Sequence, residues 1–178
     1  MSHYRAPLDN INFTLFDVLG AGRLAQCERF EDATPDTLKA IIEEAGKLAE
    51  NVLPPANKAG DEQGCSYDPE THSVKTADGF KEAYKTYREA GWSGLTASPE
   101  FGGQGLPHLL KFTIDELVCS SNLSFGMYPG LSHGAISALT EHASPELQEQ
   151  YLGKLVAGDW SGTMCLTEPQ CGTDLGLI

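Results

Sequence analysis

The stretch TPDTLKAIIEEAGKLAENVLPP, residues 34–55, decides the fold class of this chain. It opens on a residue type that favours a helix N-cap, followed by a proline and an acid in the first turn. Its apolar residues then recur every three or four positions, at 38, 41, 42, 45, 48, 49 and 52. That period is typical of an amphipathic helix, which we expect to end at Pro54-Pro55.

The same pattern recurs along the chain and predicts a helical bundle up to residue 158. Further helices are expected around 13–19, from Phe80 to Gly91, from Pro107, over 123–143, and from Pro145 to Gly158. The segment 123–143 is almost uncharged until Glu141, so a helix there should be buried on most sides. Residues 56–76 predict a loop with a short hairpin, and 91–107 predict an ordered irregular loop.

The pattern changes at Asp159. Residues 160–167 are rich in strand-forming types and predict one strand, followed by a turn at 168–172. A single strand cannot pair its own backbone groups, and the apolar tail ending at Ile178 has no capping signal. We therefore expect an N-terminal extension with a short helix at 1–33, a helical domain at 34–158, and the start of a truncated β domain at 159–178.

Composition restricts the classes of function. The 178 residues carry 12 Lys and Arg against 25 Asp and Glu, a net charge of −13 that repels nucleic-acid backbones. No apolar run approaches the roughly 18 residues that a membrane span needs. The opening MSHYRAP lacks the pattern of a signal peptide, and the five cysteines are scattered without a Cys-x-x-Cys pair. We expect a cytoplasmic protein with reduced cysteines.

For two possible sites we favour a purely structural role, which we call the bland interpretation, over a functional one. The glycine cluster at 102–105 matches neither the dinucleotide fingerprint nor the P-loop, so it predicts a tight loop with left-handed positions. Ser132 and His133 are adjacent, but a hydrolase needs a nucleophile, a base and an orienting group within hydrogen-bond reach. No Gly-x-Ser-x-Gly elbow occurs, so a packed histidine is favoured. His133 and His142 lie nine residues apart, which matches no metal-ligand spacing in a helix, so no metal site is predicted.

A third set of residues leaves two interpretations open. Phe125, Met127 and Tyr128 lie in the apolar 123–143 segment. Methionines and aromatic residues at such positions usually fill a core. The alternative is that they line an apolar cavity between helices, where bundles often bind ligands.

The stretch CLTEPQCGTD at 165–174 offers a hydroxyl at a strand end, a rigid turn, and a Gly-Thr pair able to bind phosphate. It resembles the flavin-binding signature of the acyl-CoA dehydrogenases, in which Thr-Glu-Pro is followed by Gly-Ser/Thr-Asp. Upstream, GWSGL at 91–95 and EFGGQGLP at 100–107 resemble a loop of that family's N-terminal domain. The opening YRAPLD at 4–9, with Phe13, resembles the extension of its larger-subunit branch, which includes enzymes acting on 3-(methylthio)propanoyl-CoA.

This resemblance implies a mainly α fold, the N-terminal helical bundle domain of an acyl-CoA dehydrogenase plus the first strand of its middle β domain. FAD would lie between the middle domain and a C-terminal helical domain. The backbones of Met164 and Leu166, with the backbone and hydroxyl of Thr167, would face the isoalloxazine edge. Thr173 would lie near the FAD pyrophosphate.

The resemblance also implies the reaction, in which a carboxylate base removes the α-proton of an acyl-CoA thioester while hydride passes to flavin N5. Helices matching 107–143 help to wall the acyl cavity in the family, which favours a lining role for Phe125, Met127 and Tyr128. The family's base lies in the C-terminal domain, so the fragment should be inactive. The full-length protein would use an electron-transfer acceptor and form a homo-oligomer.

A second hypothesis needs no missing domain. The chain would be a non-catalytic acidic helical interaction module, whose charge of −13 recruits a basic partner. In that case the segment after Asp159 would be only a terminal turn, and the gene would stop after Ile178.

Overall fold

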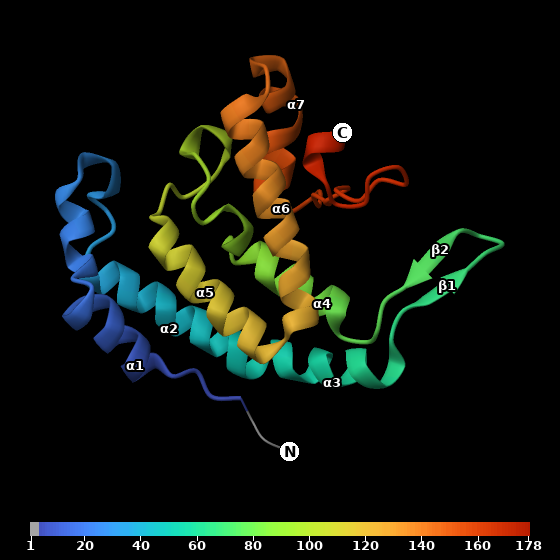
Figure 1. The fold of residues 1–178 in the computed structure, drawn as a ribbon. Helices are drawn as coiled ribbons and strands as arrows, with labels where there is room; N and C mark the ends of the chain where they lie inside the picture. Colours follow the sequence, from blue (N-terminus) through green and yellow to red (C-terminus); the bar gives the residue numbers. More distant parts are fainter. Residues whose placement is uncertain (1–3) are drawn as a thin grey trace.

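The computed structural model describes residues 4–178 and confirms the mainly α fold (Figure 1). Met1, Ser2 and His3 lie outside that range. They are the first residues of the MSHYRAP stretch, in which no signal peptide is expected. The α-helices are α1 Leu8–Asn12, α2 Pro35–Asn51, α3 Leu53–Gln63, α4 Phe80–Glu89, α5 His108–Ser121, α6 Leu123–His142 and α7 Pro145–Val156. The strands are β1 Ser66–Asp68 and β2 Ser73–Lys75.

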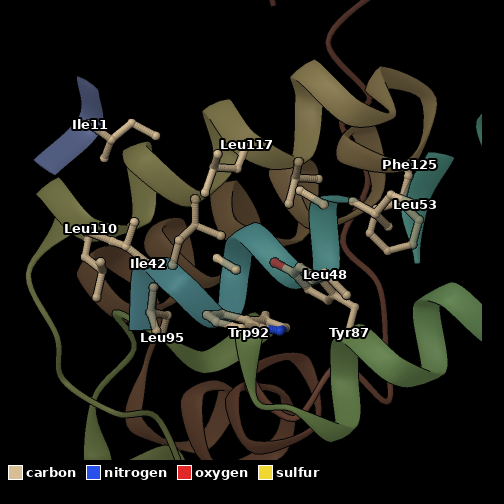
Figure 2. Packing of buried hydrophobic residues seen from close by; sticks show 14 of the residues in the cluster. Ile11, Ile42, Leu48, Leu53, Tyr87, Trp92, Leu95, Leu110, Leu117 and Phe125 are labelled. Atoms are coloured by element: carbon tan, nitrogen blue, oxygen red, sulfur yellow. The ribbon is translucent and has the colours of Figure 1, made fainter. Parts of the chain in front are cut away.

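The core lies where α2 packs against α5 (Figure 2). Ile42 and Leu48 of α2 meet Leu117 of α5 there, and all three side chains are buried. Phe125 of α6 closes one end of the same cluster. A smaller cluster, built from Ile136, Leu152, Leu155 and Val156, joins α6 to α7.

The predicted helix starts are confirmed where capping residues were recognised. The Thr34 hydroxyl accepts a hydrogen bond from the Thr37 N–H at 3.2 Å, and Pro35 occupies the first turn of α2. Ser144 and Pro145 take the same places at α7. The Thr34 hydroxyl satisfies an N–H group that α2 itself leaves without a partner, whereas the Ser144 side chain makes no capping hydrogen bond at α7.

The prediction that Pro54-Pro55 ends the helical region is wrong. α2 ends at Asn51, and the two prolines lie in the first turn of a new helix, α3. A proline is tolerated there because the first N–H groups of a helix have no intrahelical acceptor. The predicted hairpin follows at 66–75, pairs Tyr67 with Val74, and extends away from the helices (Figure 1).

The loop at 91–107 is ordered and irregular, as predicted, with 3-10 turns at Trp92–Gly94 and Pro99–Phe101. Its glycine cluster serves packing. A Cβ built on Gly103 would lie 2.1 Å from the Ala97 carbonyl oxygen, so only glycine fits that position. The bland interpretation of this cluster is therefore the correct one.

The prediction that the 123–143 helix is buried on most sides is wrong. α6 forms, but Leu123 is 63% exposed and Met127 is 57% exposed. An uncharged helix is buried only where other elements of the chain pack against it. Residues 4–178 supply such elements on one side of α6 only. Within the same residues no helix is both long and apolar enough to cross a bilayer.

The predicted strand over 160–167 is not formed as part of a sheet. The segment leaves α7 as extended chain, and no other strand lies beside it in the described part of the protein. The predicted turn is present, because Glu168 and Gly172 form an isolated antiparallel bridge. A strand forms by hydrogen bonding to a neighbouring strand, and residues 4–178 supply no such neighbour for this segment.

One buried corner joins α5 to α6. The Asn122 side chain accepts from the Phe125 N–H at 2.9 Å, which caps α6, and it donates to the Leu53 carbonyl at 3.2 Å. The neighbouring Ser121 hydroxyl donates to the Ala49 carbonyl at 2.6 Å. Two consecutive side chains thus bind the α5–α6 corner to the junction of α2 and α3.

We expect Asn122→Ala to lower the free energy of unfolding by about 2–3 kcal/mol, because it removes a cap and leaves a buried carbonyl unpaired. Asn122→Ser, which keeps a cap acceptor but is too short to reach Leu53, should lose about half as much. Asn51→Ala removes an exposed side-chain bond and serves as the control. Urea unfolding followed by circular dichroism measures all three, and an unchanged midpoint for Asn122→Ala would contradict the role of the corner.

Candidate functional site

The segment that carries the predicted cofactor residues leaves α7 at a fixed point. The Tyr84 hydroxyl donates to the Gly158 carbonyl at 2.9 Å, and Arg88 forms an ion pair with Asp159. Gly158 has a φ of +72°, and a Cβ on it would lie 2.7 Å from the Ser93 hydroxyl. Left-handed backbone and lack of space both require glycine here. Contacts from α4 therefore set where the C-terminal segment begins.

A second contact holds the segment against α6. The Gly162 N–H donates to the Ser132 hydroxyl at 3.1 Å, and that hydroxyl donates in turn to the Tyr128 carbonyl at 3.1 Å. A Cβ on Gly162 would lie 2.5 Å from the Ala135 Cβ, so backbone meets helix without a side chain between them. Ser132 thus bonds only to backbone groups, and the pairing of a nucleophile with a base is not formed.

Beyond this contact the backbone has free hydrogen-bonding groups. Within residues 4–178, no N–H or C=O of residues 163–167 has a hydrogen-bond partner. Met164 is 66% exposed, Leu166 is half-buried and Thr167 is exposed. Unpaired backbone groups in an extended segment can bind either a neighbouring strand or a ligand.

The turn that follows brings two of the predicted residues together. Glu168 and Gly172 exchange two backbone hydrogen bonds, each of 2.9 Å. Thr167 and Thr173 flank this antiparallel bridge, so their backbones lie opposite each other and both side chains are exposed. Gly172 has a φ of +59°, which allows the tight return of the chain.

The turn offers neutral donors only. Two exposed hydroxyls and free N–H groups can bind phosphate or the polar edge of a ring. No lysine or arginine occurs between Asp159 and Ile178, so any negative charge bound here must be held without a cation from this segment.

The three residues predicted to line a substrate cavity lie on two sides of α6. Phe125 is buried, with its ring centroid 5.5 Å from that of Tyr87 and 6.4 Å from that of Tyr128. Tyr128 is 42% exposed and lies over a cleft between α6 and α4. Met127 instead points from the exposed side of the helix. The structure brings Phe125 and Tyr128 together and separates Met127 from both.

The exposed side of α6, which we call the open face, carries Leu123, Met127, Gly130 and Gly134. A Cβ at Gly130 or Gly134 would meet nothing within 4 Å, so no packing within residues 4–178 requires glycine there. Gly126 differs, because a Cβ on it would lie 2.6 Å from the Cys119 sulfur. Glycine inside a helix costs about 1 kcal/mol relative to alanine, so the open face sacrifices helix stability for space.

A polar cluster lies where α5 meets α6. Lys111 is only 5% exposed, and its ammonium lies 2.5 Å from the Asp115 carboxylate. The His133 ring centroid is 5.6 Å from that of His108. Burial lowers the pKa of His133, and the positive charge of Lys111 and the nearby His108 lower it further. His133 is thus a packed histidine with its proton disfavoured, in agreement with the bland interpretation.

Sequence reasoning missed several residues that position the site. Arg88 and Tyr84 contact residues about 70 positions away along the chain. Contacts at that separation produce no local pattern in the sequence. The sequence around Ser132 suggests only a possible nucleophile and gives no sign of its contact with Gly162. One signal was available, since Gly126, Gly130 and Gly134 recur at a spacing that places them on one side of a helix.

Comparison with known proteins gives consistent results. A family described as "Acyl-CoA dehydrogenase, N-terminal domain" matches residues 35–159. A 3-methylmercaptopropionyl-CoA dehydrogenase of Ruegeria pomeroyi is 35% identical over 98% of this chain and 29% of its own length. A broad-specificity linear acyl-CoA dehydrogenase of Mycobacterium tuberculosis is 31% identical over 99% of this chain and 28% of its own length. This chain therefore spans about 30% of the length of such relatives.

A solved structure supports the fold. A chain from a study of the electron transferring flavoprotein of Acidaminococcus fermentans superposes with a TM-score of 0.60. The match covers 77% of this chain and 33% of that chain, at 23% identity. At this identity the likeness bears on the helical arrangement alone.

Substitutions on the open face test whether it is uncovered. Gly130→Ala and Gly134→Ala should each raise the free energy of unfolding by about 0.5–1 kcal/mol, because the added Cβ meets open space and favours the helix. Gly126→Ala is the matched control and should lower it by about 1–3 kcal/mol through the clash with Cys119. Urea unfolding measures the series, and a loss of stability at both Gly130 and Gly134 would contradict an open face.

Proposed function

Because the chain belongs to the acyl-CoA dehydrogenase family, we propose that it is the N-terminal part of an FAD-dependent enzyme acting on an acyl-CoA thioester. The reaction removes a proton from the α-carbon and a hydride from the β-carbon, which leaves a double bond between them. The bound flavin supplies the hydride acceptor, at N5. The observation that carries the proposal is the flavin-type segment at 165–174, which follows a family-matched helical domain and has unpaired backbone groups at 165–167 before its turn.

The residues of the C-terminal segment fit a flavin. We assign the free backbone groups of Met164 and Leu166, and the backbone and hydroxyl of Thr167, to the polar edge of the isoalloxazine. The Thr173 hydroxyl, opposite Thr167 across the Glu168–Gly172 bridge, is assigned to the pyrophosphate. A ring edge rich in N and O atoms needs donors and acceptors of this kind, because burying them unpaired costs about 1–3 kcal/mol each.

The acyl chain is assigned to the open face of α6. Met127 is the predicted lining residue on that face, and Gly130 and Gly134 allow close approach of a chain along the helix. Phe125 supports the helix from its buried side. Tyr128 is directed to the cleft on the other side, so among the three predicted residues Met127 is our choice for contact with the acyl group.

The base that removes the α-proton is proposed to lie outside residues 1–178. Glu168 and Asp174 directly follow the assigned residues Thr167 and Thr173 in sequence, but Glu168 is only half-buried and Asp174 is exposed. A base in this enzyme class needs a raised pKa, which requires burial away from water. The rest of the polypeptide would supply such a site, together with contacts to an electron-transfer acceptor and to other subunits of a homo-oligomer in the cytoplasm.

The proposal predicts different behaviour for the chain and its parent. The parent gene should continue past codon 178, and its full product should purify with flavin absorbance that bleaches when acyl-CoA is added without an acceptor. The purified 178-residue chain should show little flavin absorbance and no reduction of an artificial electron acceptor. The test is to sequence the gene and to record the absorbance spectra of the full product and of the 178-residue chain. Turnover by the 178-residue chain would overturn the proposal that the base lies outside it.

A substitution tests the cofactor residues individually. Thr167→Val in the full-length product should weaken FAD retention about tenfold, because one hydrogen bond to the flavin is lost while shape is kept. Thr163→Val, four residues earlier on the same extended segment, is the matched control and should leave retention unchanged. Flavin release on dilution measures both. Equal retention in the two variants would remove Thr167 from the site.

A further inference from the structure

The cleft over which Tyr128 lies is on a different side of α6 from the open face. It is a cleft of about 290 Å³ between α4 and α6, closed at one end by the C-terminal segment. Its lining consists of four aromatic residues, two hydroxyl residues and one lysine: Phe80, Tyr84, Phe125, Tyr128, Thr76, Ser161 and Lys81. Its volume is near the lower end of the range for small-molecule sites, so it suits a small ligand.

The aromatic walls of the cleft are held in place. Tyr128 packs edge to face against both Phe80 and Phe125, with ring centroids 6.4 Å apart and planes at 71° in each pair. Tyr84 lies 6.4 Å from Phe125, and its hydroxyl is fixed by the Gly158 carbonyl. Rings arranged in this way present faces and edges to a further flat ring, which is the geometry that aromatic pairs prefer.

Apart from the Tyr84 hydroxyl, the polar side chains of the cleft have no partner in the described structure. Within residues 4–178, Lys81 forms no ion pair, although Lys85, one turn along α4, pairs with Glu89 at 3.8 Å. The lining contains no carboxylate, even though acidic residues outnumber basic ones by 25 to 12 in the whole chain. The hydroxyls of Thr76, Tyr128 and Ser161 are not hydrogen-bonded in the described structure. The cleft therefore combines a free cation with free hydroxyl groups in a strongly acidic protein.

We propose that this cleft binds a small anion that carries a flat aromatic ring. The ring would pack among Phe80, Phe125 and Tyr128, and the anionic group would meet the Lys81 ammonium at the rim. The site is distinct from the proposed acyl face, because Phe125 and Tyr128 line the cleft, whereas Met127 lies on the open face. The inference goes beyond the proposed dehydrogenase function and does not rest on it.

The experiment titrates the 178-residue chain with phenylacetate and follows binding by ligand-detected NMR and by the rise in Tm. Phenylacetamide, which has the same shape without the charge, and cyclohexylacetate, which has the charge without the flat ring, should each bind about tenfold more weakly. Adenosine monophosphate, which joins a heteroaromatic ring to a phosphate, tests whether the ligand is a nucleotide instead of an aromatic carboxylate. Binding of either phenylacetate or the nucleotide supports the site and selects its source, whereas binding of neither overturns it.

Variants locate the binding. Lys81→Met keeps the methylene stem and should weaken binding about tenfold, while Lys85→Met, the matched control one turn away, should change it less than twofold. Tyr128→Leu should also weaken binding by removal of a wall. If that variant fails to fold, the comparison of phenylacetate with cyclohexylacetate tests the same contact. Equal losses for the two lysine variants, or none for Lys81→Met, would overturn the proposal.

Discussion

The buried corner at Ser121 and Asn122 is the constraint on which the arrangement of the site depends. A single residue separates α5 from α6, so the direction of α6 is set by whatever holds that residue. The Asn122 amide starts α6 and binds the α2–α3 junction with the same side chain. A buried amide with both ends satisfied gives one orientation, because any rotation would leave polar groups unpaired away from water. Everything that α6 presents on its sides follows from this corner.

The C-terminal segment takes its position from α6 and α4 together. Arg88 and Tyr84 fix the exit from α7, and Ser132 fixes the chain four residues later at Gly162. These two contacts, at Gly158–Asp159 and at Gly162, set the direction in which the extended backbone of the following residues leaves the helices. The order of this segment thus arises from the helical domain, although its own hydrogen-bonding groups are unpaired. The proposed cofactor site would therefore take its orientation from the helical domain.

Much of the helical fold could be predicted because its information is local. Thr34 and Ser144 precede prolines and acids at helix starts, and those patterns act within one turn. The prediction of a helix end at Pro54-Pro55 is wrong because prolines that stop one helix can also lie in the first turn of the next. The burial of α6 was also misjudged, since its apolar composition says nothing about which neighbours are present. Ser132 could not be assigned from the sequence, because its role comes from a residue 30 positions away.

The two sides of α6 differ in chemistry in a way that separates their ligands. The open face offers Leu123, Met127 and bare helix backbone, with space at Gly130 and Gly134, and suits a saturated chain that makes no hydrogen bonds. The cleft offers rigid rings and Lys81, and suits a flat ring with a charge. The segment at Gly162 packs on α6 at Ser132 with no space for even a methyl group. A single helix can therefore serve two apolar sites without mixing them, because selection rests on polar groups that only one side possesses.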